Sequence, residues 1–227
     1  MSKRRFRRIL LKVSGNCFSD EALLDSLVRQ IAAVRKGGAA VAVVMGGGNI
    51  LRGRDTVRLD RAVADKAGML ATVINGLRLA ELLAKSVPAL HLSAVPIPGT
   101  VQGYDIWTAR AALDSGKVLV LSGGTGNPFF STDSAAALRA AELGMDVILK
   151  GTRVAGVFSS DPEKNPKAKL YRRLTFAQAL EQKLAIMDLT AFALCMERRI
   201  PVVVFDVSRR DVILDIIKGK AIGSLVC

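Results

Sequence analysis

A glycine-rich segment at residues 122–128 contains the residue types most suited to chemistry in this chain. It reads Ser-Gly-Gly-Thr-Gly-Asn-Pro, which interrupts both strand and helix patterns. It follows an apolar run and precedes a helical one, and the polar side chains in and after it are Thr125, Asn127, Ser131, Thr132 and Asp133. A loop between a strand and a helix points unpaired backbone N–H groups at an anion. The segment therefore favours a phosphate-binding loop, although glycines alone are also compatible with an ordinary connection.

A second glycine-rich loop and a lysine also lie at the ends of apolar runs that predict strands. Residues 46–49 read Gly-Gly-Gly-Asn after an apolar run, so the backbone there either passes very close to a neighbour or adopts positive φ angles. Arg52 and Arg54 come shortly after this loop. Lys12 stands near the end of the run Arg8–Val13, and ligands of an open α/β sheet bind beyond such strand ends. Lys12 is therefore placed to reach a phosphate, unless it only extends along an edge toward solvent.

These features together fit phosphoryl transfer. Two anion-binding loops, a lysine at a strand end and the carboxylates of Asp133 and Asp161 can align two phosphate-bearing ligands and neutralise the transferred group. The sequence lacks the GxxxxGK(S/T) motif of P-loop kinases and the GxGxxG motif of dinucleotide sites. His91, the one histidine, lies in an apolar run without a partner motif, so we expect it to be packed, and a Ser-His-Asp hydrolase is disfavoured.

Strands and helices are expected to alternate along the chain and to position these residues. Apolar runs predict strands at residues 8–13, 39–45, 118–121, 145–150 and 200–206, a short strand within 88–96 and a terminal edge strand at 221–226. Helical spacing predicts helices at residues 21–36, 59–84, 108–115, 134–143, 174–184, from 187 onward and at 211–218. Thr132 or Asp133 is the expected N-cap of the helix at 134–143, and Asp188 caps or begins the one after 187. The fold class is α/β, with a mostly parallel central sheet between two layers of helices.

Composition narrows the class of protein. With 227 residues and 50% hydrophobic content, the chain can bury a full core. Its net charge of +13 favours anionic ligands, nucleic acid included, but 5% aromatic residues leave little for base stacking. Cys17, Cys195 and Cys227 lie far apart, which suggests neither a disulfide frame nor a zinc site and fits a reducing cytoplasm. We expect no membrane span, because no apolar run is long enough, and no signal peptide.

Several strings in the sequence are similar to those of a known family. They are residues 12–15 (Lys-Val-Ser-Gly), 46–49 with Arg52, 68–72 (Gly-Met-Leu-Ala-Thr), 187–189 (Met-Asp-Leu) and above all 124–133 (Gly-Thr-Gly-Asn-Pro-Phe-Phe-Ser-Thr-Asp). Together they resemble the bacterial uridylate (UMP) kinases, a branch of the amino acid kinase fold family. The chain departs from the usual pattern at Asn16-Cys17, where Glu-Ala is common, and at Ala155, where aspartate is common.

The resemblance implies transfer of the γ-phosphoryl group of ATP to UMP, giving UDP, in pyrimidine nucleotide biosynthesis. It also implies Mg²⁺ held mainly by the ATP phosphates rather than by residues of the chain, a homohexamer and a cytoplasmic location. One domain over residues 1–227 is implied, with an acceptor-nucleotide part at 1–150 and an ATP part at 151–227.

The matching positions carry expected roles. ATP is expected to contact Lys12, Val13, Ser14, Gly15, Gly48, Arg52, Thr152, Phe158 and Asp161. UMP is expected to contact Gly47, Asp65, Thr125, Gly126, Asn127, Pro128, Phe129, Phe130, Ser131 and Thr132. The expected catalytic residues are Lys12, Arg52 and Asp133. Lys12 and Arg52 would neutralise the transferring group, and Asp133 would orient Lys12 or the metal. Asp65 would accept hydrogen bonds from ribose hydroxyls.

Two other functions remain open from the sequence. One is a relative within the same fold family that phosphorylates a carboxylate or another small phosphate. The other is a basic nucleic-acid-binding protein, which we do not expect because aromatic residues are not interleaved with the basic ones and no known reading module is present.

Overall fold

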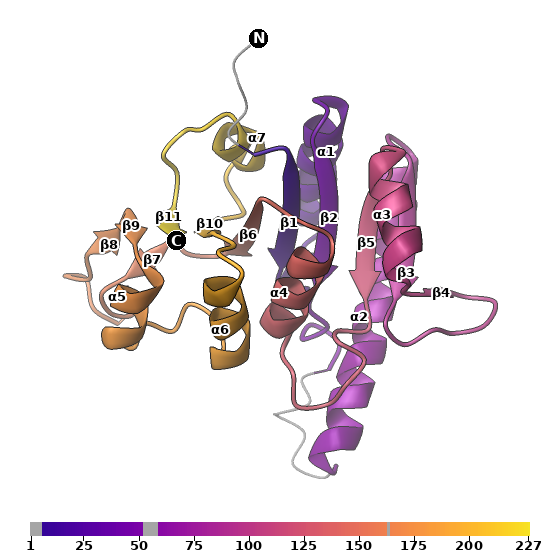
Figure 1. The fold of residues 1–227 in the computed structure, drawn as a ribbon, viewed down its shortest axis with the longest axis horizontal. Coiled ribbons are helices and arrows are strands. Elements are labelled where there is room, and N and C mark those ends of the chain that lie inside the picture. Colours follow the sequence, from indigo (N-terminus) through magenta and orange to yellow (C-terminus); the bar gives the residue numbers. More distant parts are fainter. Residues whose placement is uncertain (1–5, 52–58, 163) are drawn as a thin grey trace.

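The central feature of the fold is one large sheet. The computed structural model describes residues 6–51, 59–162 and 164–227. In this part of the chain nine strands pair in the order β4-β3-β5-β2-β1-β6-β10-β11-β9 (Figure 1). They are β1 (Arg8–Val13), β2 (Ala40–Met45), β3 (Ala89–Ser93), β4 (Gln102–Gly103), β5 (Val118–Ser122), β6 (Val147–Thr152), β9 (Arg173–Leu174), β10 (Val202–Asp206) and β11 (Ser224–Val226). Only the β10–β11 pair of this sheet is antiparallel, so the expected mostly parallel sheet is confirmed.

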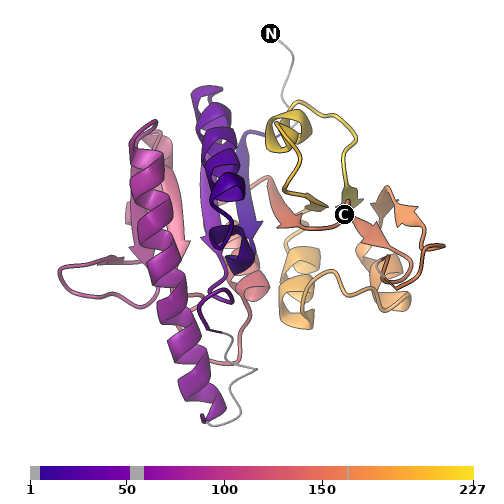
Figure 2. The same ribbon diagram turned by 180° about the vertical axis from the view of Figure 1, so that it is seen from behind.

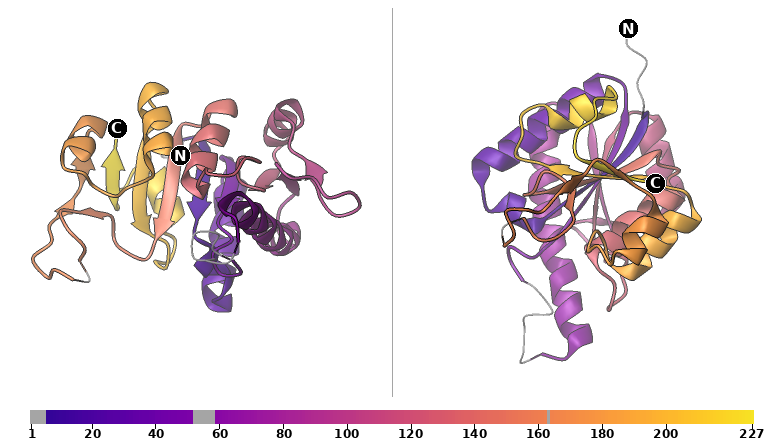
Figure 3. Two further views of the ribbon diagram at one scale, coloured as in Figure 1. Left: turned by 90° about the horizontal axis from the view of Figure 1, so that it is seen from below. Right: turned by 90° about the vertical axis from the view of Figure 1, so that its left-hand side faces the viewer.

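Helices cover both faces of the sheet, as the left view of Figure 3 shows. The helices on one face are α1 (Glu21–Lys36), α2 (Arg61–Ala84) and α7 (Val212–Ile217), which are nearest the viewer in Figure 2. Those on the other face are α3 (Ile106–Asp114), α4 (Thr132–Glu142), α5 (Phe176–Glu181) and α6 (Leu189–Glu197). A short 3₁₀ helix, η1 (Gly15–Phe18), follows β1. A separate antiparallel pair joins β7 (Val157–Phe158) to β8 (Leu170–Tyr171). The three layers expected from the sequence are therefore present.

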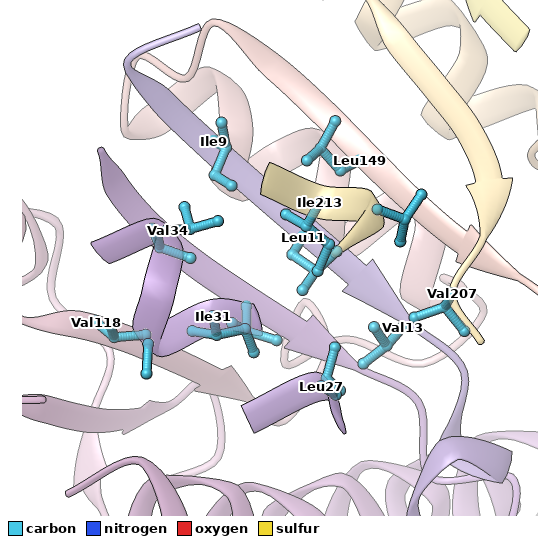
Figure 4. Packing of buried hydrophobic residues seen from close by; sticks show 14 of the residues in the cluster. Ile9, Leu11, Val13, Leu27, Ile31, Val34, Val118, Leu149, Val207 and Ile213 are labelled. Atoms are coloured by element: carbon cyan, nitrogen blue, oxygen red, sulfur yellow. The ribbon is translucent and has the colours of Figure 1, made fainter. Parts of the chain in front are cut away.

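Strand β1 divides its side chains between the two faces. Ile9, Leu11 and Val13 are fully buried against α1 and α7, where Ile31 and Ile213 pack on them (Figure 4). The alternate residue, Leu10, belongs to the core under α4. Because successive strand residues point to opposite faces, Lys12 follows Leu10 onto the α4 face. The hydrophobic pattern of β1 thus decides which helix its lysine can reach.

The end of the chain differs from the prediction. Residues 221–226 were expected to form an edge strand, but β11 lies between β10 and β9, with Leu225 opposite Arg173 and Val226 opposite Leu174. The outer strand, β9, is only two residues long, so it carries no periodic signal. A helix was predicted at residues 174–184, but Leu174 belongs to β9. Helix α5 begins at Phe176, after the N-cap Thr175.

Among the described residues, α2 is the one helix long and apolar enough to cross a membrane by length and composition. The sequence predicted a helix here but no membrane span, because Arg78 and Glu81 interrupt the apolar run. Leu79 and Leu83 of this helix are fully buried, and α2 lies against β3 and β5. A core helix passes the same test of length and composition, so we read α2 as part of the core.

Two glycines with positive φ allow a matched test of the close packing around β11. Gly223 has φ +73°, and a Cβ there would lie 2.2 Å from the carbonyl oxygen of Val204. Gly144 has φ +60° after α4, with nothing within 4 Å of an added Cβ. Gly144→Ala should cost about 1 kcal/mol, the cost of the left-handed backbone alone, and lower Tm by about 2–4 °C. Gly223→Ala should lower Tm at least twice as far in thermal unfolding. Equal shifts would contradict this packing.

Candidate active site

A cavity of about 640 Å³ opens at the carboxyl ends of β1, β2 and β5. Its walls come from the loops after these strands, from α2 and from the first turns of α4 and α6. The lining residues are Lys12, Ser14, Gly15, Gly46, Gly47, Gly48, Leu51, Arg61, Asp65, Gly68, Met69, Thr72, Gly124, Phe129, Phe130, Ser131, Thr132, Asp133, Asp188, Leu189 and Thr190. Both glycine-rich loops and the lysine predicted from the sequence therefore meet in one place.

Two lysines and one aspartate form a charged cluster at this cavity. Lys12 on β1 and Lys150 on β6 are paired in register on neighbouring parallel strands. Asp133 lies between them: its Oδ1 is 2.8 Å from Lys12 Nζ, and its Oδ2 is 2.7 Å from Lys150 Nζ. Each of the three side chains is only 14% exposed, so solvent screens these ion pairs weakly. The expected contact between Asp133 and Lys12 is present.

The protonation of the cluster follows from its burial. Burial alone would raise the pKa of the Asp133 carboxyl, but the ammonium groups of Lys12 and Lys150 outweigh it and hold that pKa below its usual value. Burial lowers the pKa of the Lys150 ammonium, against the opposing attraction of Asp133. Asp133 is therefore an ionised carboxylate at neutral pH, with each oxygen directed at a lysine.

The first turn of α4 places Asp133. Ser131, in an extended conformation, is the N-cap, and its hydroxyl accepts hydrogen bonds from the N–H groups of Asp133 (2.9 Å) and Ser134 (3.2 Å). The prediction that Thr132 or Asp133 caps this helix was wrong, because Thr132 already has helical geometry. Asp133 stands instead at the second helical position, where a carboxylate also interacts favourably with the helix dipole.

Asp188 joins the start of α6 to the start of α4. It is the N-cap of α6 and accepts a hydrogen bond from Ala191 N–H at 3.0 Å, which confirms the predicted cap. The same carboxylate accepts hydrogen bonds from Ser134 Oγ (2.8 Å) and from Ser131 Oγ. Although burial alone would raise it, these hydrogen bonds hold the pKa of Asp188 below its usual value. The Ser131 hydroxyl is therefore committed to the cap and to Asp188.

The triple glycine is explained by close approach. A Cβ at Gly15 would lie 2.7 Å from Gly48 N, and one at Gly47 would lie 2.7 Å from the carbonyl oxygen of Gly68. Residues 46–48 are not among the glycines with positive φ. The sequence left two explanations open for these glycines, positive φ angles or a very close neighbour. The structure supports the close neighbour, which is backbone in both cases. Asn75 of α2 fixes this loop by donating to the Gly46 carbonyl at 2.8 Å.

The loop after β5 is also held by α2. Gly123 N–H donates to Thr72 Oγ1 at 2.7 Å, and that hydroxyl donates to the Met69 carbonyl at 2.6 Å. Asp65 accepts hydrogen bonds from Phe129 N–H at 2.9 Å and from Arg61 Nε at 3.0 Å. Phe129 has φ +71°, a strained conformation for a residue with a side chain.

Of the residues expected to bind ligands, ten line the cavity: Lys12, Ser14, Gly15, Gly47, Gly48, Asp65, Phe129, Phe130, Ser131 and Thr132. Others lie outside its lining. They are Val13, Thr125, Gly126, Asn127, Pro128, Thr152, Phe158 and Asp161. Val13 is fully buried in the core, so its side chain is directed away from the cavity. Arg52 lies outside the described residues.

His91 is packed, as predicted. Its Nε2 is 2.8 Å from Ser122 Oγ, and burial lowers its pKa to about 4. It lies against α2 at Gly76, where an added Cβ would come within 2.4 Å of the ring. His91 does not line the cavity.

Sequence reasoning missed Lys150, Thr72, Asn75 and Arg61. Lys150 carries the same signal as Lys12, a lysine at the end of a buried strand, and could have been found by it. For Thr72 and Asn75 the sequence of α2 gives no sign of a role at the site. Isolated polar side chains are common on the apolar face of a helix. Their partners become visible only once the loops after β2 and β5 are placed.

No group of three His, Cys, Asp or Glu side chains able to hold a metal ion is found among the described residues. The three carboxylates that line the cavity are already bound to lysines, an arginine, serine hydroxyls and backbone N–H groups. This donor set suits a cation that keeps phosphate and water ligands, as Mg²⁺ commonly does.

Known proteins are similar to this chain in fold and in sequence. A model of the amino acid kinase family matches residues 7–206. A uridylate kinase of Pseudomonas paraeruginosa is 43% identical, covering 98% of this chain and 95% of the relative. One from Alcanivorax borkumensis is also 43% identical, covering 98% and 92%. The crystal structure of UMP kinase from Bacillus anthracis matches with a TM-score of 0.94 and 32% identity, covering 97% of this chain and 96% of that one. UMP kinase from Ureaplasma parvum matches with 0.90 and 38%, covering 98% and 99%. The chain belongs to the amino acid kinase family.

Proposed function

We propose that this protein transfers the γ-phosphoryl group of ATP to UMP and releases ADP and UDP, as a step of pyrimidine nucleotide biosynthesis. The observation that carries the proposal is the charged cluster of Lys12, Asp133 and Lys150, set between two glycine-rich loops at one cavity. The similarity to uridylate kinases over nearly the full chain supports the choice of acceptor.

In the proposed mechanism the chain supplies alignment and charge. The backbone at residues 14–15 and at Gly48 takes the phosphates of ATP, Gly47 contacts UMP, and Lys12 reaches the transferred group from the end of β1. The UMP phosphate binds near Thr132, and Asp65 accepts hydrogen bonds from the ribose. Lys12 neutralises charge that develops in the transition state, while Asp133 fixes its ammonium group. Arg52, outside the described residues, is proposed to share this role.

The remaining ligand contacts divide between two parts of the domain. We propose that the acceptor nucleotide binds to the part at 1–150, including the turn at residues 125–130, and that ATP also uses Thr152, Phe158 and Asp161 of the part at 151–227. Thr152 is the last residue of β6, the strand that carries Lys150, Phe158 is in β7, and Asp161 follows β7. All three lie outside the cavity lining. Mg²⁺, held mainly by the ATP phosphates, would supply further charge neutralisation.

We also propose that the protein works as a cytoplasmic homohexamer. Val63, Leu70, Ile74 and Leu77 of α2 are exposed, and their spacing places them along one stripe of the helix. An exposed apolar stripe is typical of a protein–protein interface. The cysteines among the described residues are free thiols, which suits a reducing compartment.

The proposed reaction is tested by a substrate panel. With ATP and Mg²⁺, the purified protein should form UDP from UMP at a rate well above the rates with CMP, dTMP and AMP, measured by coupled ADP release and chromatography of products. Aspartate, N-acetylglutamate and carbamate test the carboxylate- and carbamate-phosphorylating relatives. Product from one of these acceptors alone would overturn the proposal.

The role of Lys12 predicts a selective loss of turnover. Lys12→Ala should reduce kcat with UMP at least ~100-fold, the scale of one preorganised charge contact. Its fold should survive, because Lys12 lies at a strand end and Asp133 keeps Lys150 as a partner. The control is Lys117→Ala, an exposed lysine at the opposite end of the sheet, just before β5. Near-normal turnover of Lys12→Ala would mean that Lys12 has no part in the transfer.

The role of Asp65 predicts a selective loss of acceptor binding. Asp65→Asn should raise KM for UMP at least ~10-fold, because hydrogen bonds to a charged group contribute about 1.5–3 kcal/mol. KM for ATP should stay almost unchanged. The matched control is Asp60→Asn, which removes a carboxylate at the same end of α2 but keeps a good N-cap. If both KM values rise together, Asp65 is not a ligand of the acceptor.

A further inference from the structure

Lys150 takes part in the charged cluster without lining the cavity. Lys12 and Asp133 line it, whereas Lys150 lies behind Asp133. We propose that Lys150 is a positioning residue for phosphoryl transfer, which holds one oxygen of Asp133 so that the other oxygen directs Lys12 at the transferred group. This inference rests on the proposed function and adds a residue that the family resemblance did not assign.

The register of the sheet brings the two lysines to the same helix. Lys12 and Lys150 are paired across β1 and β6. Leu10 and Ile148, two residues before each lysine, both belong to the core under α4. The alternation of strand side chains therefore directs both lysines at the α4 face. Like charges at neighbouring positions repel each other, and the carboxylate of Asp133 between them relieves that repulsion.

Lys150 is anchored from two sides. Its ammonium group donates to Asp133 Oδ2 on α4 at 2.7 Å and to the carbonyl oxygen of Ile186, ahead of α6. Because α4 and the segment before α6 both hold the Lys150 ammonium group, this group stays in place when the Asp133 carboxylate rotates. Asp133 therefore has one fixed ion pair, to Lys150, and its second oxygen is left in a defined place for Lys12.

The charge of the cluster also depends on Lys150. Lys12 and Asp133 alone would form a neutral pair at the cavity wall. With Lys150, two ammonium groups face one carboxylate, and the cluster keeps a net positive charge. Positive charge beside the transferred group is what a phosphoryl-transfer site requires. Lys150 therefore offsets the negative charge that Asp133 would otherwise place next to a phosphate.

A structural role would have a different signature from a positioning role. The start of α6 is attached to α4 not only through Lys150 but also through Asp188, which accepts hydrogen bonds from Ser131 and Ser134. Loss of the Lys150 contacts therefore leaves α6 attached. A purely structural lysine would change Tm, with kcat per folded molecule unaltered.

The test begins with Lys150→Met, which keeps an unbranched side chain one atom shorter than that of lysine and removes the ammonium group with its charge. Turnover with UMP should fall at least ~10-fold, since misplacing a catalytic group by about 1 Å can cost ~100-fold. KM for UMP and for ATP should stay within about twofold, because Lys150 is not on the cavity wall. Lys117→Met is the matched control and should equal the parent. If Lys150→Met gives no folded protein, Lys150→Gln, which keeps a polar N–H donor without the charge, replaces it with the same expected loss.

A double-mutant comparison decides whether Lys150 acts through Asp133. In an Asp133→Asn background, Lys150→Met should lower kcat by less than about twofold, because residues that act as one unit have non-additive effects. Loss of the same factor in both backgrounds would overturn the inference, and so would unchanged kcat for Lys150→Met in an active parent. A parent that forms no UDP would overturn the proposed function and this inference together.

Discussion

Two charged lysines on neighbouring strands that point to the same place repel each other, and a negative charge between them relieves that repulsion. The register of β1 and β6 puts Lys12 beside Lys150, and the core residues before them direct both toward α4. Asp133 can meet both only because α4 begins at Thr132, which puts the carboxylate in the first turn. Ser131 sets that starting point as the N-cap, and Asp188 holds Ser131 from the start of α6. Sheet register, helix capping and the attachment of α6 are thus linked through one ionised carboxylate.

Helix α2 has a comparable organising role on the acceptor side. Asn75 holds the loop after β2 and Thr72 holds the loop after β5, each by a buried hydrogen bond to backbone. About two turns nearer the N-terminus of α2, Asp65 holds the backbone of Phe129. A rigid helix therefore sets the spacing of two glycine-rich loops that the sequence separates by more than seventy residues. Because Gly47 leaves no space for a side chain against Gly68, this spacing allows almost no variation.

The sequence predicted the parts of the structure that have a strong local signal. The apolar run of β1 and the amphipathic spacing of α1 are recovered with the same bounds. Edge strands of two residues, such as β9, have too few positions for any periodicity, and β11 was therefore misplaced at the edge. The cap of α4 was shifted by one or two residues because Ser131, Thr132 and Asp133 are all good N-cap residues. Lys150 was missed although it stands near the end of a buried strand, as Lys12 does; only the pairing of β1 with β6 shows that both lysines meet Asp133. The triple glycine could be interpreted only when its neighbour, Gly15, was placed.

The position of β11 also constrains the order in which the sheet can be assembled. Strand β9 is synthesised some fifty residues before β11, yet in the described structure its partner in the large sheet is β11. During translation β1, β2 and β5 can pair as soon as they have left the ribosome, whereas β9 has to wait for a strand made much later. Residues 173–174 therefore stay without their partner in the large sheet until β11 has been made, and this side of the sheet closes last.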